Sequence, residues 1–370
     1  MKEYKVLAIN PGSTSTKVAV FKGTEKLFSE NISHAAEELA QFATISDQRE
    51  FRLGIIKEMI AKAGVDISDL DAVVGRGGGL IACDGGVYGI NDVLYEHAVL
   101  GFNGVQHPAQ LGPQIAKLFS EECGCPAFVV NPPDTDEIVP EARMTGIKGV
   151  FRNVHLHALN QKETAIQHSK NVGKKYEDCN YVVAHIGGGT SIAAHRKGKM
   201  IDGNDTVGGD GPMTPTRCGS VPVAEIVNII AKGEYDVKAA KGLSTKTGGF
   251  VNLLGTSDAI EVSNRAAEGD RFAKLCWDTM IFQIIKQIGA MAAILEGDVD
   301  GILLGGGMVH NKELVARITK ACSFIAPVTA YPGEFEMEAM ASGAARVLDG
   351  EEELKTYTGK LNWDKADFMP

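Results

Sequence analysis

Short apolar runs that end in glycine or hydroxyl residues alternate along the chain with longer segments in which apolar residues recur at helical spacing. The apolar runs predict buried strands at residues 72–74, 127–130, 181–185 and 301–304. Helical spacing predicts helices near residues 49–63, 109–122, 158–169, 223–232, 258–268, 271–295 and 337–348. This alternation of strands and helices indicates an α/β fold.

The first apolar run ends in "NPGSTSTK", residues 10–17, whose composition is close to that of a phosphate-binding P-loop. The spacing differs, because Thr16 stands where the P-loop has its second glycine and Val18 stands where it has a serine or threonine. The alternatives are another kind of phosphate site, or a strand end followed by a turn.

An internal repeat favours the phosphate site. "VLAINPGSTSTKVAVFKG" from Val6 aligns with "VVAHIGGGTSIAAHRKG" from Val182. Both segments predict a β-hairpin whose turn presents backbone N–H groups and hydroxyls. Such backbone concavities bind anions without the P-loop spacing. We therefore expect two domains that each direct one such turn into a shared cleft and hold a phosphate chain from both sides.

At 370 residues the chain exceeds the size that one hydrophobic core usually supports, so two domains are expected. The interpretation places residues 1–152 with about 338–370 in an N-terminal domain, and residues 153–337 in a C-terminal domain. The helix near 337–348 should therefore return to pack on the first domain.

Composition and charge narrow the function classes. The formal charge of −10 argues against a nucleic-acid partner. The N-terminal run is interrupted by Asn10, Pro11 and Gly12, which argues against a signal peptide, and no segment is apolar enough to span a membrane. Seven cysteines without framework spacing fit a reducing, cytoplasmic compartment. The 43 glycines gather at predicted strand ends, where backbone can approach a ligand closely.

The duplicated strand–turn–strand pattern resembles the actin, sugar-kinase and heat-shock ATPase superfamily. Within it, the chain resembles the butyrate kinases of the acetate kinase family of acid kinases. The strings that carry the resemblance are "INPGSTSTK", "VVGRGGGL", "HALNQK", "VAHIGGGTSIAAHRKG" and "SFIAPV", in this order between residues 5 and about 350.

The resemblance implies duplicated ribonuclease-H-like (actin-like ATPase) domains. Each would be a mixed sheet flanked by helices, with an interdomain active-site cleft, the carboxylic acid on the N-terminal side and the nucleotide on the C-terminal side. It implies reversible, in-line transfer of the γ-phosphoryl group of ATP to a short-chain fatty acid, which gives an acyl phosphate and ADP. Mg²⁺ is the implied cofactor, and a homodimer or higher homo-oligomer the implied assembly. Because a carboxylic acid has a pKa near 4 to 5 and is already ionised, no catalytic base is required. Positioning and charge neutralisation should dominate catalysis.

Four residues match the family's catalytic positions: Asn10, Arg76, His157 and Arg217. Two arginines can balance the charge of an anion that meets ATP. Arg76 lies between glycines, which we expect to let its side chain reach into the cleft. For His157 the simpler alternatives are that His155 serves instead, or that either histidine only caps the following helix.

The resemblance assigns a further set of residues to phosphate or nucleotide, although a turn asparagine, solvent-facing hydroxyls and a structural histidine are the plain alternatives. The set is Ser13, Ser15, Lys17, His185, Gly187, Gly188, Gly189, Asp258, Gly305, Gly306 and Gly307.

Glu336 matches the family's magnesium-linked glutamate, with Glu334 and Glu338 close enough to be alternatives. The chain departs from the family at Asn131, where the family has an aspartate that helps to organise magnesium. Either Asp134 or Asp136 replaces it through a local shift, or magnesium binding is weaker.

Gly78, His107 and Leu156 match positions of the acyl pocket. Acetate kinases carry valine and phenylalanine where this chain has Gly78 and Leu156, so the pocket should accept more than a methyl group. At about 0.8 kcal/mol for each buried methylene, butyrate or isobutyrate should be preferred over acetate by roughly tenfold or more.

Three alternative functions remain open. One is a non-catalytic, ATP-gated scaffold of the actin or chaperone type, which would not need a carboxylate clamp. Another is an acid kinase that prefers acetate or propionate. The third is a sugar kinase, which should carry an aspartate base, for which Asp210 is the candidate. The preferred acid, the physiological direction of the reaction and the oligomeric state are not readable from the sequence.

Overall fold

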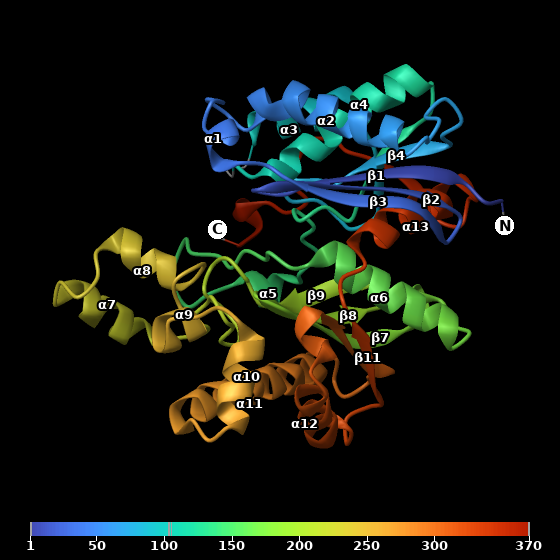
Figure 1. Cartoon of the computed structure of the whole chain (residues 1–370). Coiled ribbons are helices and arrows are strands. Elements are labelled where there is room, and N and C mark those ends of the chain that lie inside the picture. Colours follow the sequence, from blue (N-terminus) through green and yellow to red (C-terminus); the bar gives the residue numbers. More distant parts are fainter. Residues whose placement is uncertain (1, 103, 105, 369–370) are drawn as a thin grey trace. The chain divides into compact units, whose positions relative to one another are not determined.

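The computed structural model describes residues 2–102, 104 and 106–368, which form two compact units (Figure 1). The first unit comprises the chain up to Asp136 together with Phe335–Asp367, and the second comprises Glu137–Glu334 with Phe368. The first boundary therefore falls before Glu137 rather than after residue 152 as the sequence suggested. The reason is local: Glu137 forms a buried ion pair with Lys162, and the backbone N–H of Val139 donates to the carbonyl of Ile201.

The first unit contains a mixed sheet. Among the described residues its strand order is β12-β5-β6-β4-β1-β2-β3. Strand β1 pairs antiparallel with β2 and parallel with β4. The strands are β1 (Lys5–Pro11), β2 (Ser15–Lys22), β3 (Glu25–Ser33), β4 (Ala72–Gly75), β5 (Val87–Gly89), β6 (Ala127–Val130) and β12 (Leu354–Thr356).

The second unit contains a mixed sheet with the order β11-β10-β7-β8-β9. Strand β7 pairs antiparallel with β8 and parallel with β10. The strands are β7 (Asn180–Ile186), β8 (Thr190–Arg196), β9 (Lys199–Gly203), β10 (Gly301–Gly306) and β11 (Val328–Pro332).

The two sheets share a topology. In both, three strands linked in sequence pair antiparallel, and two later strands add in parallel on the other side of the first strand. The order β3-β2-β1-β4-β6 thus corresponds to β9-β8-β7-β10-β11. This correspondence confirms that the sequence repeat reflects two related folding units, each opening with a hairpin.

Helices cover both faces of each sheet. In the first unit α4 packs on β4, β6 and β1 on one face, and α13 packs on β1, β4 and β6 from the other (Figure 1). The C-terminal helix therefore does return to the first unit. The helices of this unit are α1 (Ala36–Leu39), α2 (Arg49–Lys62), α3 (Asp92–Leu100), α4 (Leu111–Cys123) and α13 (Glu336–Leu348), with 3-10 turns η1 (Ser46–Gln48), η2 (Pro108–Gln110) and η5 (Lys365–Phe368), the last reaching the unit boundary.

In the second unit alternate residues of β7 face opposite layers. Val182 and Ala184 join the large core under α11, whereas Tyr181 and Val183 pack in a smaller core with Ala165 of α6. The helices are α5 (Pro140–Arg143), α6 (Ala158–Asn171), α7 (Val223–Ala231), α8 (Val237–Leu243), α9 (Gly249–Leu254), α10 (Ala259–Ala267), α11 (Arg271–Ile294) and α12 (Lys312–Cys322), with 3-10 turns η3 (Tyr176–Asp178) and η4 (Gly307–His310). Across the described residues, no helix has both the length and the apolar character that a membrane span requires.

Candidate active site

The turn that joins β1 and β2 is held from beneath by a buried arginine. The backbone N–H of Gly12 donates to the carbonyl of Ser15 at 2.7 Å. Arg52 of α2, fully buried, donates through Nη1 to the carbonyls of Gly12 and Ser15, both at 2.9 Å, and to Thr16 Oγ1. Burial lowers the pKa of Arg52 to about 10, so the guanidinium stays charged at neutral pH. A positive charge hydrogen-bonded to neutral oxygens lies beneath this turn, which favours an anion near it.

The side chains of the turn itself are accessible. Ser13 is exposed and Ser15 is half-buried. Lys17 is exposed and continues β2, where it pairs with Asn10 in the strand register. Contacts from these residues to phosphate stay predictions.

Arg76 directly follows β4 and is buried to 9% exposure. Its Nη2 lies 3.4 Å from Glu336 Oε1, and its Nη1 is buried without a hydrogen-bond partner. Asn10, at the end of β1, donates through Nδ2 to Glu336 Oε2 at 2.7 Å. The structure thus brings together three of the predicted site residues, and leaves one buried guanidinium nitrogen able to bind an added anion.

The glycines beside Arg76 have a different purpose from the one the sequence suggested. A Cβ at Gly75 would overlap the backbone of Gly112 in α4, and a Cβ at Gly77 would lie 2.6 Å from Val129 Cγ1. The glycines therefore permit close packing of the backbone around Arg76, and packing rather than freedom of movement fixes its position.

The three neighbouring glutamates are distinguished by their contacts. Glu336 contacts Arg76 and Asn10, whereas Glu338 pairs with Lys26 on the surface. Glu334, at the end of the Glu137–Glu334 segment of the second unit, lies 3.6 Å from His185 Nε2. The geometry therefore favours Glu336 over Glu338 as the glutamate beside the site arginine.

Asn131 follows β6 with a positive φ of 39°, a conformation that asparagine tolerates better than most residues. Its side-chain Oδ1 accepts from the backbone N–H of Gly86 at 2.8 Å, and its own N–H donates to the Gly86 carbonyl. The residue is 2% exposed. Asn131 thus holds a turn, and its part in magnesium binding stays a prediction.

Gly78 and Leu156, which the resemblance assigns to the acyl pocket, are both buried among protein atoms. A Cβ at Gly78 would lie 3.0 Å from the Cβ of Ala109, so the neighbouring η2 turn occupies the volume that the smaller residue leaves. Leu156 is 5% exposed and packs in a core of the second unit beside Ala193 and Gly203. The size of an acyl pocket at these positions stays a prediction.

His107 is the residue of the predicted pocket that remains accessible. It precedes η2, and its Nδ1 accepts from the backbone N–H of Ala109 at 3.1 Å. The surrounding protein, and secondly the charge of Arg76, lower the pKa of His107. The electrostatic coupling places His107 near the site arginine.

In the second unit His157 and His185 form a stacked pair. Their ring centroids are 4.0 Å apart and the rings are inclined by 16°. His157 is the residue before α6, and its Nδ1 lies 2.8 Å from Ser191 Oγ. His155 instead pairs with Asp205 at 2.9 Å, so the two candidate histidines have distinct surroundings. Of these two, His157 is the one that contacts Ser191 of β8 and stacks on His185.

The glycine turn between β7 and β8 is held by the segment that carries Arg217. Thr214 and Thr216 both donate through Oγ1 to the carbonyl of Gly188, at 2.8 and 3.1 Å. A Cβ at Gly189 would overlap Nη1 of Arg217, whereas a Cβ at Gly188 would meet nothing within 4 Å.

Nε and Nη1 of Arg217 are buried without hydrogen-bond partners. Burial lowers the pKa of Arg217, and the nearby Asp205 carboxylate partly offsets this effect. Like Arg76, Arg217 has guanidinium nitrogens placed to bind an anion.

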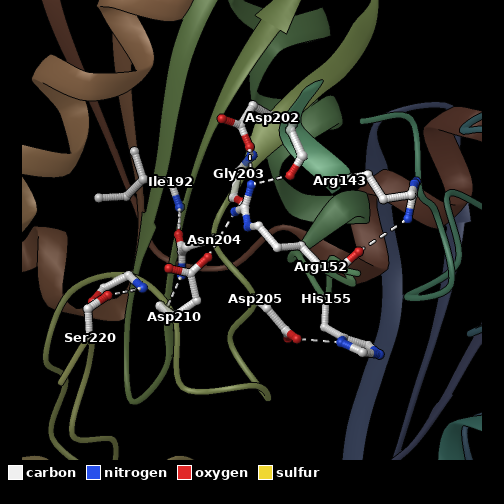
Figure 2. Close-up of polar contacts among 12 residues, drawn as sticks. Arg143, Arg152, His155, Ile192, Asp202, Gly203, Asn204, Asp205, Asp210 and Ser220 are labelled. Carbon is white, nitrogen blue, oxygen red and sulfur yellow. Dashed lines mark hydrogen bonds and ion pairs between the residues drawn. The ribbon is translucent and has the colours of Figure 1, made fainter. Parts of the chain in front are cut away.

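Figure 2 shows how the loop after β9 is tied to this turn. Asn204 accepts from the N–H of Ile192 and donates to the carbonyl of Thr190, so one side chain bridges the loop and the start of β8. Arg152 pairs with Asp202 at 3.0 Å and with Asp210 at 2.8 Å. Because Asp210 is held in this ion pair, it is a poor candidate for the catalytic base of a sugar kinase.

The remaining predicted nucleotide residues lie on two elements. Gly305 and Gly306 end β10, and Gly307 begins η4. Gly306 has φ 96°, and a Cβ there would overlap the backbone of Ile186. Asp258 caps α10 by accepting from the N–H groups of Ile260 and Glu261. Contact of either element with a nucleotide stays a prediction.

The sequence reasoning missed residues that support the site rather than line it. These are Arg52, Gln161, His195 and Asn204. Their partners lie far away in sequence or on other elements, and no motif marks them. Gln161 and His195 belonged to quoted strings, "HALNQK" and "VAHIGGGTSIAAHRKG", but neither was singled out.

The carboxylate group near Arg76 could bind Mg²⁺ only if substrate phosphates or waters supplied the other ligands of the cation. Among the described residues, no three histidine, cysteine, aspartate or glutamate side chains converge as a metal site. Mg²⁺ is commonly held by one or two carboxylates together with substrate phosphates and waters. The single carboxylate of Glu336 fits that mode.

Comparison with known proteins agrees with this fold. The acetokinase family model matches residues 147–326. The crystal structure of an acetate kinase from Porphyromonas gingivalis superposes with a TM-score of 0.72 at 20% identity, covering 93% of this chain and 100% of that one. That of Entamoeba histolytica gives 0.73 at 15% identity, with coverage of 93% and 100%. These structures establish the duplicated α/β fold of the acid kinases.

Sequence relatives define the branch. A probable butyrate kinase of Clostridium botulinum (strain Eklund 17B / Type B) is 43% identical over 354 residues, covering 96% of this chain and 99% of that protein. Butyrate kinase 2 of Clostridium acetobutylicum is 42% identical over 355 residues, with the same coverage. The chain belongs to the butyrate kinase branch of the acetokinase family.

Proposed function

We propose that the protein transfers the γ-phosphoryl group of ATP to the carboxylate of a short-chain fatty acid, and catalyses the reverse reaction that forms ATP. The observation that carries this proposal is the lack of hydrogen-bond partners at buried nitrogens of the two site arginines. Arg76 and Arg217 each have buried guanidinium nitrogens without hydrogen-bond partners. An ATP-gated scaffold does not need a second anion clamp, whereas transfer between two anions does.

The chemistry follows from the charges. One oxygen of the ionised acid attacks the γ-phosphorus and forms a new P–O bond, while the bond from phosphorus to the β–γ bridging oxygen breaks. ADP leaves with that electron pair, and no proton has to be removed from the acid. Arg76 would hold the acid or the transferring group, and Arg217 and His157 would stabilise the equatorial oxygens, since the negative charge there must be balanced in the transition state.

The remaining site residues would position the phosphates and the cation. The first turn, over Arg52, and the glycine turn, held by Thr214 and Thr216, would offer N–H groups to the phosphates. Glu336 would hold Mg²⁺, and the bound cation would neutralise charge on the phosphate oxygens. Asn10 fixes one oxygen of Glu336, which orients the carboxylate.

The preferred acid is proposed as butyrate or a branched isobutyrate-like acid. Support now comes from the relatives named as butyrate kinases rather than from the residues at positions 78 and 156. The proposal further includes a homo-oligomer, because α7 carries seven apolar residues among nine and buries none of them. A cytoplasmic location is supported by the seven cysteines, all of which are free thiols.

Hydroxamate formation tests the function directly. The protein is incubated with Mg²⁺-ATP, hydroxylamine and straight or branched acids of two to six carbons, and the acyl phosphate is trapped as hydroxamate. We expect the highest kcat/KM with a four-carbon acid. An absence of product with every acid would refute the kinase, and a maximum with acetate would refute the proposed preference.

A further inference from the structure

A chain of buried hydrogen bonds runs from the ring of His157 into the core of the second unit. His157 Nδ1 contacts Ser191 Oγ at 2.8 Å, and Gln161 Nε2 contacts the same oxygen at 2.6 Å. Gln161 Oε1 contacts His195 Nε2 at 3.0 Å, and His195 Nδ1 contacts the hydroxyl of Tyr176 at 2.8 Å. Ser191, Gln161 and His195 are fully buried, so water does not compete for these bonds.

The donor and the acceptor of each hydrogen bond can be assigned by starting from oxygen atoms that can only accept. Gln161 Nε2 also lies 3.0 Å from the backbone carbonyl of Ser191, which is an acceptor. The amide nitrogen of Gln161 must therefore face Ser191, and its oxygen must face His195. Because that oxygen only accepts, His195 carries its proton on Nε2.

The inner end of the chain is consistent with this direction. His195 then accepts at Nδ1, and the hydroxyl of Tyr176 donates to it. Burial, and secondly the charge of Lys162, lower the pKa of His195 to about 3, so its ring is neutral at physiological pH. Burial raises the pKa of Tyr176, so its hydroxyl keeps the proton.

At the His157 end of this series of hydrogen bonds, only one arrangement of the protons is then possible. Ser191 Oγ accepts from Gln161 Nε2 and, at 3.3 Å, from the backbone N–H of His157. With both lone pairs engaged, the serine donates its own proton to Nδ1 of His157. A proton on Nδ1 would direct a third donor at an oxygen that already accepts two.

We propose that Gln161 and Ser191 are positioning residues that hold the neutral ring of His157 with its proton on Nε2. That proton lies on the side of the ring opposite Ser191, so His157 acts as a hydrogen-bond donor. This inference rests on the proposed function for its purpose: a donor, rather than an acceptor, stabilises the oxygens of a transferring phosphoryl group. The stacked His185 supports the ring from its face.

The ring state can be measured in the intact protein. In a sample labelled with ¹⁵N-histidine, long-range ¹H–¹⁵N spectra at about pH 8 distinguish the two neutral forms of a histidine ring and the imidazolium. The signals of His157 are assigned from their loss in His157→Gln. We expect a protonated Nε2 and an unprotonated Nδ1, and a protonated Nδ1 in the wild-type protein would overturn the proposal.

Gln161→Glu should reverse the hydrogen bond between residue 161 and Ser191 with little change in the shape of the side chain. An ionised carboxylate accepts from both His195 and Ser191, so the serine proton turns away from His157. Nδ1 should then become protonated, and kcat should fall at least about tenfold with KM values changed less than about threefold. The spectrum is recorded where the ¹³C shift of the introduced carboxyl group shows it to be ionised. An unprotonated Nδ1 under that condition would contradict the proposal.

Tyr176→Phe is the matched control, because it removes a bond at the inner end but leaves Gln161 in place. It should lower stability yet leave the ring state of His157 unchanged and kcat within about threefold. An equal loss of kcat in both variants would mean general structural damage and overturn the assignment. The two proposals fail separately: a correct ring state without hydroxamate refutes only the kinase, and hydroxamate with the other ring state refutes only this inference.

Discussion

At the scale of single residues, Arg76 combines burial with an incomplete set of partners. Its Nη2 is near Glu336 while Nη1 has none, and close packing at Gly75 and Gly77 keeps it in place. Binding an anion would satisfy the unpaired nitrogen. A side chain held this way is poorly suited to structural stabilisation alone, because an unpaired buried donor costs free energy.

Replacement of Arg76 should therefore affect turnover more than folding. We expect Arg76→Ala to lower kcat/KM by about a hundredfold or more. The kcat/KM of Arg76→Lys should lie between those of the wild-type protein and Arg76→Ala, since lysine keeps the charge but not the planar guanidinium group. Hydroxamate kinetics measure the effect. Arg49→Ala, on the surface of the same unit, is the control. Unchanged turnover in Arg76→Ala would remove this residue from the mechanism.

The lowered pKa of His195 predicts how the free energy of unfolding depends on pH. Its pKa is about 3 in the folded protein and about 6.5 when unfolded. Between these values the unfolded chain binds the extra proton, so the free energy of unfolding should fall as pH falls below about 6.5, by on the order of 1 kcal/mol per pH unit. Urea denaturation at pH 7 and pH 5 measures the difference. The loss should be smaller in His195→Gln, and an equal loss in that variant would show that other groups cause it.

Several roles at this scale could not be read from the sequence. The chemical type of Arg76, His157 and Arg217 is visible in their motifs. The turn held by Asn131, and the filling of space at Gly78 by Ala109, depend on partners distant in the chain. Ser191 gives the same lesson, since a hydroxyl in a predicted turn proves to point into the core.

At the scale of elements, the glycine turn and the segment carrying Arg217 form one assembly. Two threonine hydroxyls hold the Gly188 carbonyl, and the absent side chain of Gly189 leaves room for the guanidinium. The turn thus leaves room for Arg217 and is joined to its segment.

A methyl group at Gly189 should displace Arg217 without unfolding the unit, because it meets the end of a flexible side chain. We expect Gly189→Ala to lower kcat at least about tenfold with little loss of thermal stability. Gly289→Ala is the control, since that glycine lies in α11 with nothing within 4 Å of a Cβ, and alanine should raise helix stability by up to about 1 kcal/mol. Normal activity of Gly189→Ala would refute this placement of Arg217.

The elements themselves were largely predictable. Strand β6 and the starts of α2, α6, α7 and α11 agree with the sequence prediction. Strands β3, β5, β9, β11 and β12 were not predicted. Strands β3 and β12 are mostly exposed and carry no buried pattern, and β5, β9 and β11 are three to five residues long. Domain boundaries near Glu137 depended on one buried ion pair that composition does not reveal.

At the scale of the whole molecule, helix α7 gives the basis for self-association. Val223 is 75% exposed and Val227 is 59% exposed, on a helix that with α8 lies at the edge of the second unit (Figure 1). The chain carries a formal charge of −10, so copies repel one another over most of their surface. An apolar face is where contact between copies costs least and removes most apolar area from water.

A charge on that face should prevent association. We expect Val227→Glu to reduce the molar mass measured by light scattering after size-exclusion chromatography. Phe324→Glu, at a site 84% exposed outside α7, should leave it unchanged. A monomeric wild-type protein at micromolar concentration would contradict the proposed assembly.

The matching strand orders of the two sheets also bear on ancestry. Two copies of one folding unit, joined in a single chain, were free to accumulate different substitutions, which two identical subunits are not. One copy now has an arginine–glutamate pair beside its hairpin, and the other has a glycine turn with two histidines. The duplicated fold thus carries different groups beside its two hairpins, which a pair of identical subunits could not do.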